Sequence, residues 1–241
     1  ARPLASSRNV KLPERVLGEA REGSAISVSR SALAYLVADA ARLDRRLVWM
    51  DSNGLATELP LPRKIYEHVA ISPDKRTAVV QVVSGSIELW LLDLERNTLT
   101  PFITTGGSSQ APVWTPDGKH VIYRATRNGV RNLYWKAADG SGDEERLTTK
   151  PGFLQTPASA WSGGGSTVVT FSETGAQQAR RIWTLTLDGS RETKLHVAQN
   201  GTENAHISPD GKWIAFQFED SGATEVYLQP FSGGGARVPV V

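Results

Sequence analysis

The residues in this sequence that are able to perform acid–base or nucleophilic chemistry are scattered. Its four histidines, His68, His120, His196 and His206, show no metal-site spacing such as His-Glu-x-x-His. The run GGSSQ at 106–110 lacks the Gly-x-Ser-x-Gly order that presents a nucleophilic serine. There is no cysteine, which excludes thiolate catalysis, disulfides and cysteine-bound zinc. We therefore predict that the chain has no catalytic residues and is not an enzyme.

Two patterns that resemble ligand-binding loops are weak. Gly118-Lys119 and Gly211-Lys212 lack the upstream glycine of a phosphate-binding loop. The loop DGSGDEE at 139–145 alternates oxygen-bearing side chains, as calcium sites do, but Glu144 stands where a glycine is expected. Lys150 stands where the bidentate acid is expected. The sequence therefore predicts no bound metal and no cofactor.

The charge balance and hydropathy exclude two classes of partner. Lysine and arginine number 27 against 25 acidic residues, so the net charge of +2 creates no large field to attract nucleic acid. No run approaches the roughly 18 to 20 apolar residues of a membrane-spanning helix. We expect neither nucleic-acid binding nor direct membrane insertion.

A short turn motif recurs along the chain and indicates how the polar residues are positioned. It reads SPDK at 72–75, TPDG at 115–118 and SPDG at 208–211, with weaker copies at 29–31 and 162–165. Successive copies lie 43 to 47 residues apart, a period associated with propeller blades and with some helical repeats. Proline presets one turn dihedral and the Asp or Ser side chain bonds nearby amides, so the motif predicts a structural turn.

Strand patterning after each turn decides between these two repeat classes. A β-rich segment follows every copy, and then an aliphatic–aromatic pair that suits a strand packed between neighbouring blades. Glycine-containing turns and a further β-rich segment complete most units. The sequence predicts an all-β protein, a β-propeller of four-stranded antiparallel blades. The aliphatic–aromatic pairs are Val48-Trp49, Leu89-Trp90, Leu133-Tyr134, Ile182-Trp183 and Val226-Tyr227.

The segment SPDGKWIAF at 208–216, followed by VYL at 226–228, resembles the TolB-type, WD-like propeller repeat. The resemblance covers about residues 25–241, with departures at Lys75, where glycine is usual, and in the first and fourth units. Similar repeats occur in periplasmic TolB, in propellers of bacterial serine/threonine kinases and in prolyl-oligopeptidase-like peptidases. Five repeat units are visible, whereas the family's TolB member has six blades. We therefore expect either that five blades close with one strand spare or, as we favour, that the five blades belong to a longer six-bladed parent.

The expected domain organisation follows from these units. Residues 1–13 form a flexible arm and 14–241 a propeller, with repeat units at about 25–63, 67–104, 110–149, 156–198 and 203–241. Val16 precedes Ser29 by the same interval that separates Leu59 from Ser72. We therefore expect residues 14–19 to act as a fourth strand that closes the ring.

Polar residues that precede the turn motifs are candidates for a binding site. The inner strands of a propeller line its central channel, so these side chains from separate blades are expected near one mouth of the channel. We predict that they bind a protein, a peptide or a cationic ligand, although they also fit hydrated channel residues. The candidates are Ser24, Glu67, His68, Gln110, Gln155, Glu203 and Asn204.

Three functions remain open from the sequence. The first is a non-catalytic protein- or peptide-binding scaffold or sensor, with the periplasmic or extracytoplasmic bacterial location that the resemblance implies. The second is the substrate-gating propeller of a prolyl-oligopeptidase-like serine peptidase whose catalytic domain lies outside this sequence. The third is a small-molecule- or sugar-binding propeller that uses Trp49, Trp90, Trp135 and Trp183.

Overall fold

The computed structural model describes residues 26–28, 32–38, 45–51, 53–104, 106–150, 154–175, 178–220, 223–233 and 235–240. Within these ranges the strands form five sheets, each of four antiparallel strands in chain order.

Each sheet is one blade, and its strands have the following bounds. Blade 1 contains β1 (Ile26–Val28), β2 (Ala32–Ala38), β3 (Arg45–Asp51) and β4 (Ala56–Glu58). Blade 2 contains β5 (Ile65–Ile71), β6 (Thr77–Ser84), β7 (Ser86–Asp93) and β8 (Thr98–Ile103). Blade 3 contains β9 (Ser109–Trp114), β10 (His120–Arg127), β11 (Val130–Ala137) and β12 (Glu145–Arg146). Blade 4 contains β13 (Leu154–Gly163), β14 (Ser166–Thr174), β15 (Arg180–Thr186) and β16 (Thr193–Val197), and blade 5 contains β17 (Thr202–Ile207), β18 (Trp213–Asp220), β19 (Ala223–Pro230) and β20 (Val238–Pro239).

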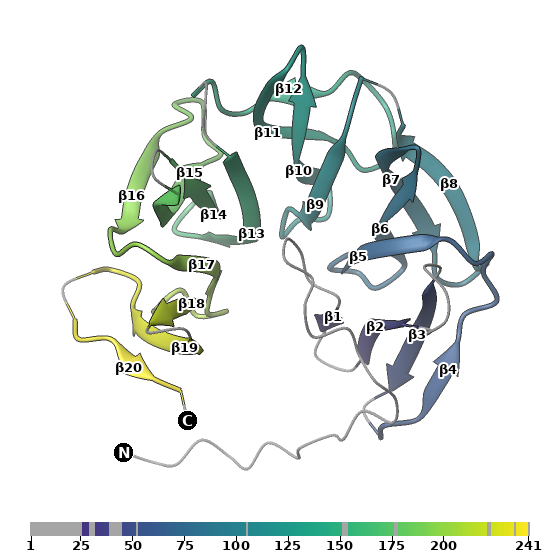
Figure 1. Ribbon diagram of the computed structural model, residues 1–241, viewed down its shortest axis with the longest axis horizontal. Helices are drawn as coiled ribbons and strands as arrows, with labels where there is room; N and C mark the ends of the chain where they lie inside the picture. Colours follow the sequence, from purple (N-terminus) through teal and green to yellow (C-terminus); the bar gives the residue numbers. More distant parts are fainter. Residues whose placement is uncertain are drawn as a thin grey trace.

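The blades follow one another around a common centre, with the first strand of each blade nearest to it and the fourth at the periphery (Figure 1). This arrangement confirms the predicted all-β propeller of four-stranded blades. Four inner strands begin at Ile65, Ser109, Leu154 and Thr202, one or two residues before the starts predicted for their units. The predicted arm at 1–13, the closing strand at 14–19 and Ser24 all lie outside the described residues.

The turn motif builds the same hydrogen-bonded hairpin in blades 2, 3 and 5. In blade 3, the Thr115 hydroxyl donates to Asp117 at 2.6 Å, and Asp117 accepts the Lys119 amide at 3.0 Å. Ser72 with Asp74, and Ser208 with Asp210, repeat this set of bonds. The structure therefore gives these aspartates the turn-stabilising role that the sequence predicts for them.

The departures from the motif have visible consequences in the turns. Lys75 adopts a φ of 63°, in the left-handed region where the corresponding Gly118 and Gly211 both have a φ of 70°. Blade 4 lacks the proline and aspartate, and its first hairpin closes through Gly164 and Gly165, both at positive φ. The missing motif thus shortens this turn but leaves the hairpin intact.

Alternating residues of the second strands β6 and β10 pack against the two neighbouring blades. In β6, Ala78, Val80 and Val82 belong to a buried cluster with Leu47 of blade 1, whereas Val79 packs against blade 3. Similar clusters join blade 3 to blade 4 and blade 4 to blade 5. Packing on both faces explains the near-continuous apolar sequence of β6.

Blade 5 differs because no comparable packing joins it to blade 1 among the described strands. The aliphatic residues Leu89, Leu133 and Ile182 are fully buried, whereas their counterpart Val226 is 39% exposed. Figure 1 shows β17–β20 and β1–β4 as the two ends of the series. The face of blade 5 that carries Val226 is therefore open in the described part of the chain.

Candidate binding site

The inner strands share an irregularity close to the predicted binding residues. A register shift interrupts the pairing of the first two strands in blades 2 to 5, for example between Tyr66 and His68 in β5. Two residues at these bulges, Ala111 and Asn204, have positive φ angles of 52° and 51°. A β-bulge redirects the neighbouring side chains, and here it recurs at the same end of each inner strand. We call this end of blades 2 to 5, with the adjoining ends of the second strands, the inner rim.

Each blade of the inner rim joins a polar side chain of its first strand to one of its second strand. Glu67 accepts a hydrogen bond from Gln81 at 2.7 Å, and Asn204 donates to Gln217 at 2.6 Å. In blade 3 Arg124 donates to Gln110, and in blade 4 Gln155 donates to Glu173 at 2.9 Å. The structure therefore brings predicted residues from four blades to equivalent places.

Several of these side chains also connect blade 2 to blade 3. The buried amide of Ala111 donates to Gln81 Oε1 at 2.9 Å. His68 hydrogen-bonds to the backbone of Pro112, which has no N–H, so the imidazole donates to its carbonyl. Trp114 Nε1 donates to the carbonyl of Ala70 at 2.9 Å. These bonds fix the blade positions at the rim by means of polar side chains and main-chain atoms.

The junctions at blade 4 use ion pairs as well. Arg124 of blade 3 donates to Thr156 Oγ1 of blade 4 at 2.9 Å. Lys150 pairs with the nearly buried Glu173 at 2.6 Å, and Arg180 of blade 4 pairs with Glu203 of blade 5. Gln155 and Glu203 are thus engaged within the protein.

Burial changes the protonation of His68. The side chain is 7% exposed, and desolvation lowers its pKa to about 4 although its bond to Pro112 acts in the opposite direction. The imidazole is therefore neutral at pH 7. It carries no charge with which to attract a ligand to the rim.

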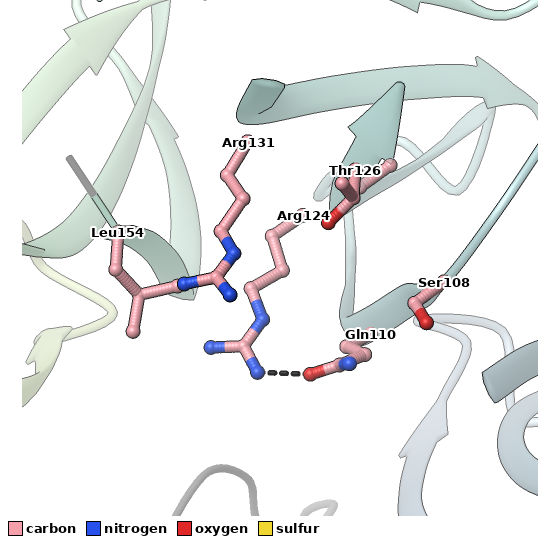
Figure 2. Close-up of a pocket in the computed structure, with 7 residues that line it drawn as sticks. Ser108, Gln110, Arg124, Thr126, Arg131 and Leu154 are labelled. Atoms are coloured by element: carbon pink, nitrogen blue, oxygen red, sulfur yellow. Dashed lines mark hydrogen bonds between the residues drawn. The ribbon is translucent and has the colours of Figure 1, made fainter. Parts of the chain in front are cut away.

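A cavity of about 200 Å³ opens at the inner rim between blades 3 and 4. It is lined by Ser108, Gln110, Arg124, Ala125, Thr126, Arg131 and Leu154. Figure 2 shows the guanidinium groups of Arg124 and Arg131 next to each other, between Leu154 on one side and Gln110 on the other. Arg124 is 6% exposed and held by Gln110 and Thr156, whereas Arg131 is exposed. The cavity therefore presents a buried and an exposed guanidinium group side by side.

Comparison with known proteins places this geometry in a known architecture. No protein-family model matches the chain. An uncharacterized protein from Agrobacterium fabrum is 29% identical over 194 residues, which cover 74% of this chain and 64% of that protein. TolB from Acinetobacter baumannii superimposes with a TM-score of 0.72 and 20% identity, covering 87% of this chain and 52% of that one. The chain has a TolB-type propeller fold.

Other solved structures extend the comparison. A protein described as a TolB candidate from Agrobacterium tumefaciens has a TM-score of 0.72 and 22% identity, covering 89% of this chain and 79% of that one. The tricorn protease has a TM-score of 0.63 and 15% identity, covering 89% of this chain and 22% of that one. The chain spans 64% of the Agrobacterium fabrum relative and about half of the Acinetobacter TolB. At these identities, the solved structures show a shared fold.

In this TolB-type propeller, one of the predicted binding residues, Gln110, lines the rim cavity. Glu67, His68, Gln155, Glu203 and Asn204 lie elsewhere on the inner rim in the contacts described above. Sequence reasoning missed Arg124 and Arg131. Arg124 stands at the same distance after its turn motif as Gln81 and Gln217 do, so aligning the second strands provides a signal for it. The position of Arg131 depends on how blades 3 and 4 meet, and the repeat carries no signal for it.

The tryptophans considered for sugar binding have neighbours on their rings. Trp135 stacks on His120 at 4.1 Å and lies 4.5 Å from the guanidinium of Arg191. Lys64 lies over Trp90 at 5.0 Å and Lys150 over Trp183 at 4.7 Å, while Trp49 packs against the core between blades 1 and 2. These contacts occupy ring faces that a sugar would need for stacking.

Two further features concern the described residues: possible metal-binding clusters and possible membrane-spanning helices. These residues contain no group of three or more histidine or acidic side chains arranged to hold a metal ion. In the loop considered for calcium, Asp139 accepts the Ser141 amide at 2.8 Å and Glu144 pairs with Arg127. The same residues contain no helix with the length and apolarity needed to cross a membrane.

Proposed function

We propose that this chain is a non-catalytic scaffold or sensor propeller that binds a protein or peptide at its inner rim. The observation that carries the proposal is the rim cavity, where backbone and side chains of two blades surround a polar space of about 200 Å³. The neighbouring side chains are held by hydrogen bonds within and between blades, so the site is preorganised.

The location that we propose is the periplasm or another extracytoplasmic site of a bacterium. It is supported by the resemblance to the TolB-type repeat and by the shared fold. The absence of cysteine is compatible with it, since such a chain tolerates oxidising surroundings.

Site-specific photo-crosslinking tests the binding proposal. A photoreactive amino acid is placed at Ser108, on the rim cavity, in the full chain, and the protein is illuminated with an envelope extract of the bacterium that encodes it. The matched control carries the same group at Lys119, in the exposed turn at the opposite end of the β9–β10 hairpin. We expect a discrete crosslinked product from Ser108 and none from Lys119. Equal products from both positions, or none from either, would contradict binding at the rim.

The substrate-gating propeller of a serine peptidase remains a second candidate, favoured by the structural likeness to the tricorn protease. The surrounding gene distinguishes the two. A nucleophile elbow of an α/β-hydrolase encoded after Val241 would favour the gating role, whereas a kinase signature before Ala1 would favour a sensor. Peptidase activity of the complete gene product, lost on substitution of that elbow serine, would establish the second candidate.

A further inference from the structure

Three acidic side chains near the inner rim have cationic partners, whereas Arg131 at the rim cavity has no acidic partner among the described residues. The acidic side chains Glu144, Glu173 and Glu203 pair with Arg127, Lys150 and Arg180 respectively. Arg131 makes no hydrogen bond or ion pair with the described part of the chain, and no described carboxylate lines the rim cavity. An exposed arginine at the edge of a cavity whose described lining contains no carboxylate favours an anion.

The shape and size of the cavity narrow the class of anion. Its volume of about 200 Å³ equals roughly seven water molecules at ~30 Å³ each, which suits one small side chain or chain end. Arg131 offers a planar donor fork, and the adjacent Arg124 adds positive charge from a fixed position. Leu154 provides an apolar wall, and Ser108 and Thr126 add hydroxyl groups. A carboxylate on a short aliphatic stem fits this combination.

We propose that the rim cavity binds a carboxylate of a peptide ligand, with Arg131 as its principal partner and Arg124 as a second positive charge. The inference rests on the proposed peptide-binding function and specifies the chemistry of the ligand. The carboxylate belongs either to an acidic side chain or to a peptide C-terminus, because both present the same group on a short stem.

Side-chain NMR with small probes tests the proposal in the full chain. The Nε–H signals of the arginines are followed while N-acetylglycine, which mimics a C-terminus, or N-acetyl-aspartic acid N-methylamide, which mimics a side chain, is added. The neutral counterparts are N-acetylglycinamide and N-acetyl-asparagine N-methylamide, and inorganic phosphate forms a further arm. We expect saturable shifts at Arg131 with at least one of the two acids and none with the amides. The acid that binds more tightly identifies the source of the carboxylate.

Matched variants separate a specific site from general charge attraction. Arg131→Gln should weaken binding of the acid roughly tenfold, and Arg131→Lys should weaken it less, because a charge remains without the planar fork. Arg146→Gln removes a charge that is also exposed, from the outer strand β12, and should leave binding unchanged. Equal shifts with acids and amides, no saturable shift, tighter binding of phosphate than of either acid, or unchanged binding by Arg131→Gln would each overturn the proposal.

Failure of the carboxylate inference can be distinguished from failure of the proposed binding function. If neither acid binds but Ser108 still crosslinks a partner, the carboxylate inference fails and the binding function stands. If an acid binds at Arg131 but no partner crosslinks, the site recognises carboxylates while the scaffold proposal loses its support.

Discussion

At the scale of single residues, Lys75 adopts a backbone conformation that is less favourable for lysine than for the glycines at the equivalent positions of blades 3 and 5. It holds a φ of 63° in a turn where blades 3 and 5 use glycine, and left-handed backbone costs a side-chain-bearing residue on the order of 1–2 kcal/mol. We predict that Lys75→Gly raises the free energy of unfolding by about 1 kcal/mol, since glycine loses some of this gain in the unfolded chain. Urea denaturation measures the change.

The reverse substitution is the control for this prediction. A Cβ atom added at Gly118 would meet only an ordinary contact, 3.7 Å from Pro73, so we expect the cost of Gly118→Lys to be mainly conformational. It should destabilise the protein by a similar amount. Stabilisation by Gly118→Lys, or no change in either variant, would refute the role assigned to the turn conformation.

His68 should make stability depend on pH. Its pKa is about 4 in the folded protein and about 6.5 when unfolded, so the unfolded chain binds the additional proton between these values. The contribution of neutral His68 to the free energy of unfolding is fully present above pH 6.5. It falls as the pH decreases towards 4, by on the order of 3 kcal/mol. The variant His68→Gln keeps a neutral donor and should flatten the profile. Urea denaturation of both proteins from pH 4 to 7 provides the measurement, and parallel profiles would exclude His68 as the source.

The positions of the polar inner-rim residues could be predicted from the sequence, but their hydrogen-bond partners could not. Placing Glu67, Gln110, Gln155, Glu203 and Asn204 at one end of the inner strands required only the repeat period. Their partners come from second strands and from neighbouring blades, and one sequence contains no record of which side chain on the next blade is within reach. Arg131 escaped notice for this reason.

At the scale of the strand, one polar position of the second strand, nine residues after the start of the turn motif, makes hydrogen bonds at the inner rim in blades 2, 3 and 5. Gln81 in β6 and Gln217 in β18 stand at this position, but Gln81 also accepts the buried amide of Ala111. We predict that Gln81→Leu lowers the free energy of unfolding by about 1–3 kcal/mol, because that amide loses its acceptor.

Gln217→Leu is the matched control, since the bond of Gln217 to Asn204 stays within blade 5 and is exposed. It should change stability by less than roughly 0.5 kcal/mol. Denaturation of the two variants under identical conditions compares them, and equal losses would show that the link between blades contributes nothing beyond the bond within the blade.

The strands themselves were predictable because their signals are local. Each aliphatic–aromatic pair lies in the third strand of its blade, and the further β-rich segments expected after these pairs form β8 and β16 in blades 2 and 4. The bulges are different, because they are set by the packing of the inner strands around the centre. Ala111 adopts a positive φ that nothing in its residue type predicts.

At the scale of the whole molecule, the open face of blade 5 should make stability uneven. Repeat proteins gain stability from each interface between neighbours, and blade 5 has such an interface on one side within the described residues. We predict that backbone amides of β18 and β19 exchange with solvent faster than those of β6 and β7 in blade 2. Native-state hydrogen exchange measures the difference, and equal protection of the two blades would show that blade 5 is stabilised on both faces.

The links between blades have a consequence for the history of the fold. Trp114, His68 and Thr170 donate across blade boundaries to the carbonyls of Ala70, Pro112 and Ala205. Every amino acid has a carbonyl, so mutation of the accepting residue does not remove the acceptor. A substitution at Ala70 or Ala205 therefore needs no compensating change of the donor on the neighbouring blade, so the two sides of a blade boundary can diverge in sequence while the bond persists.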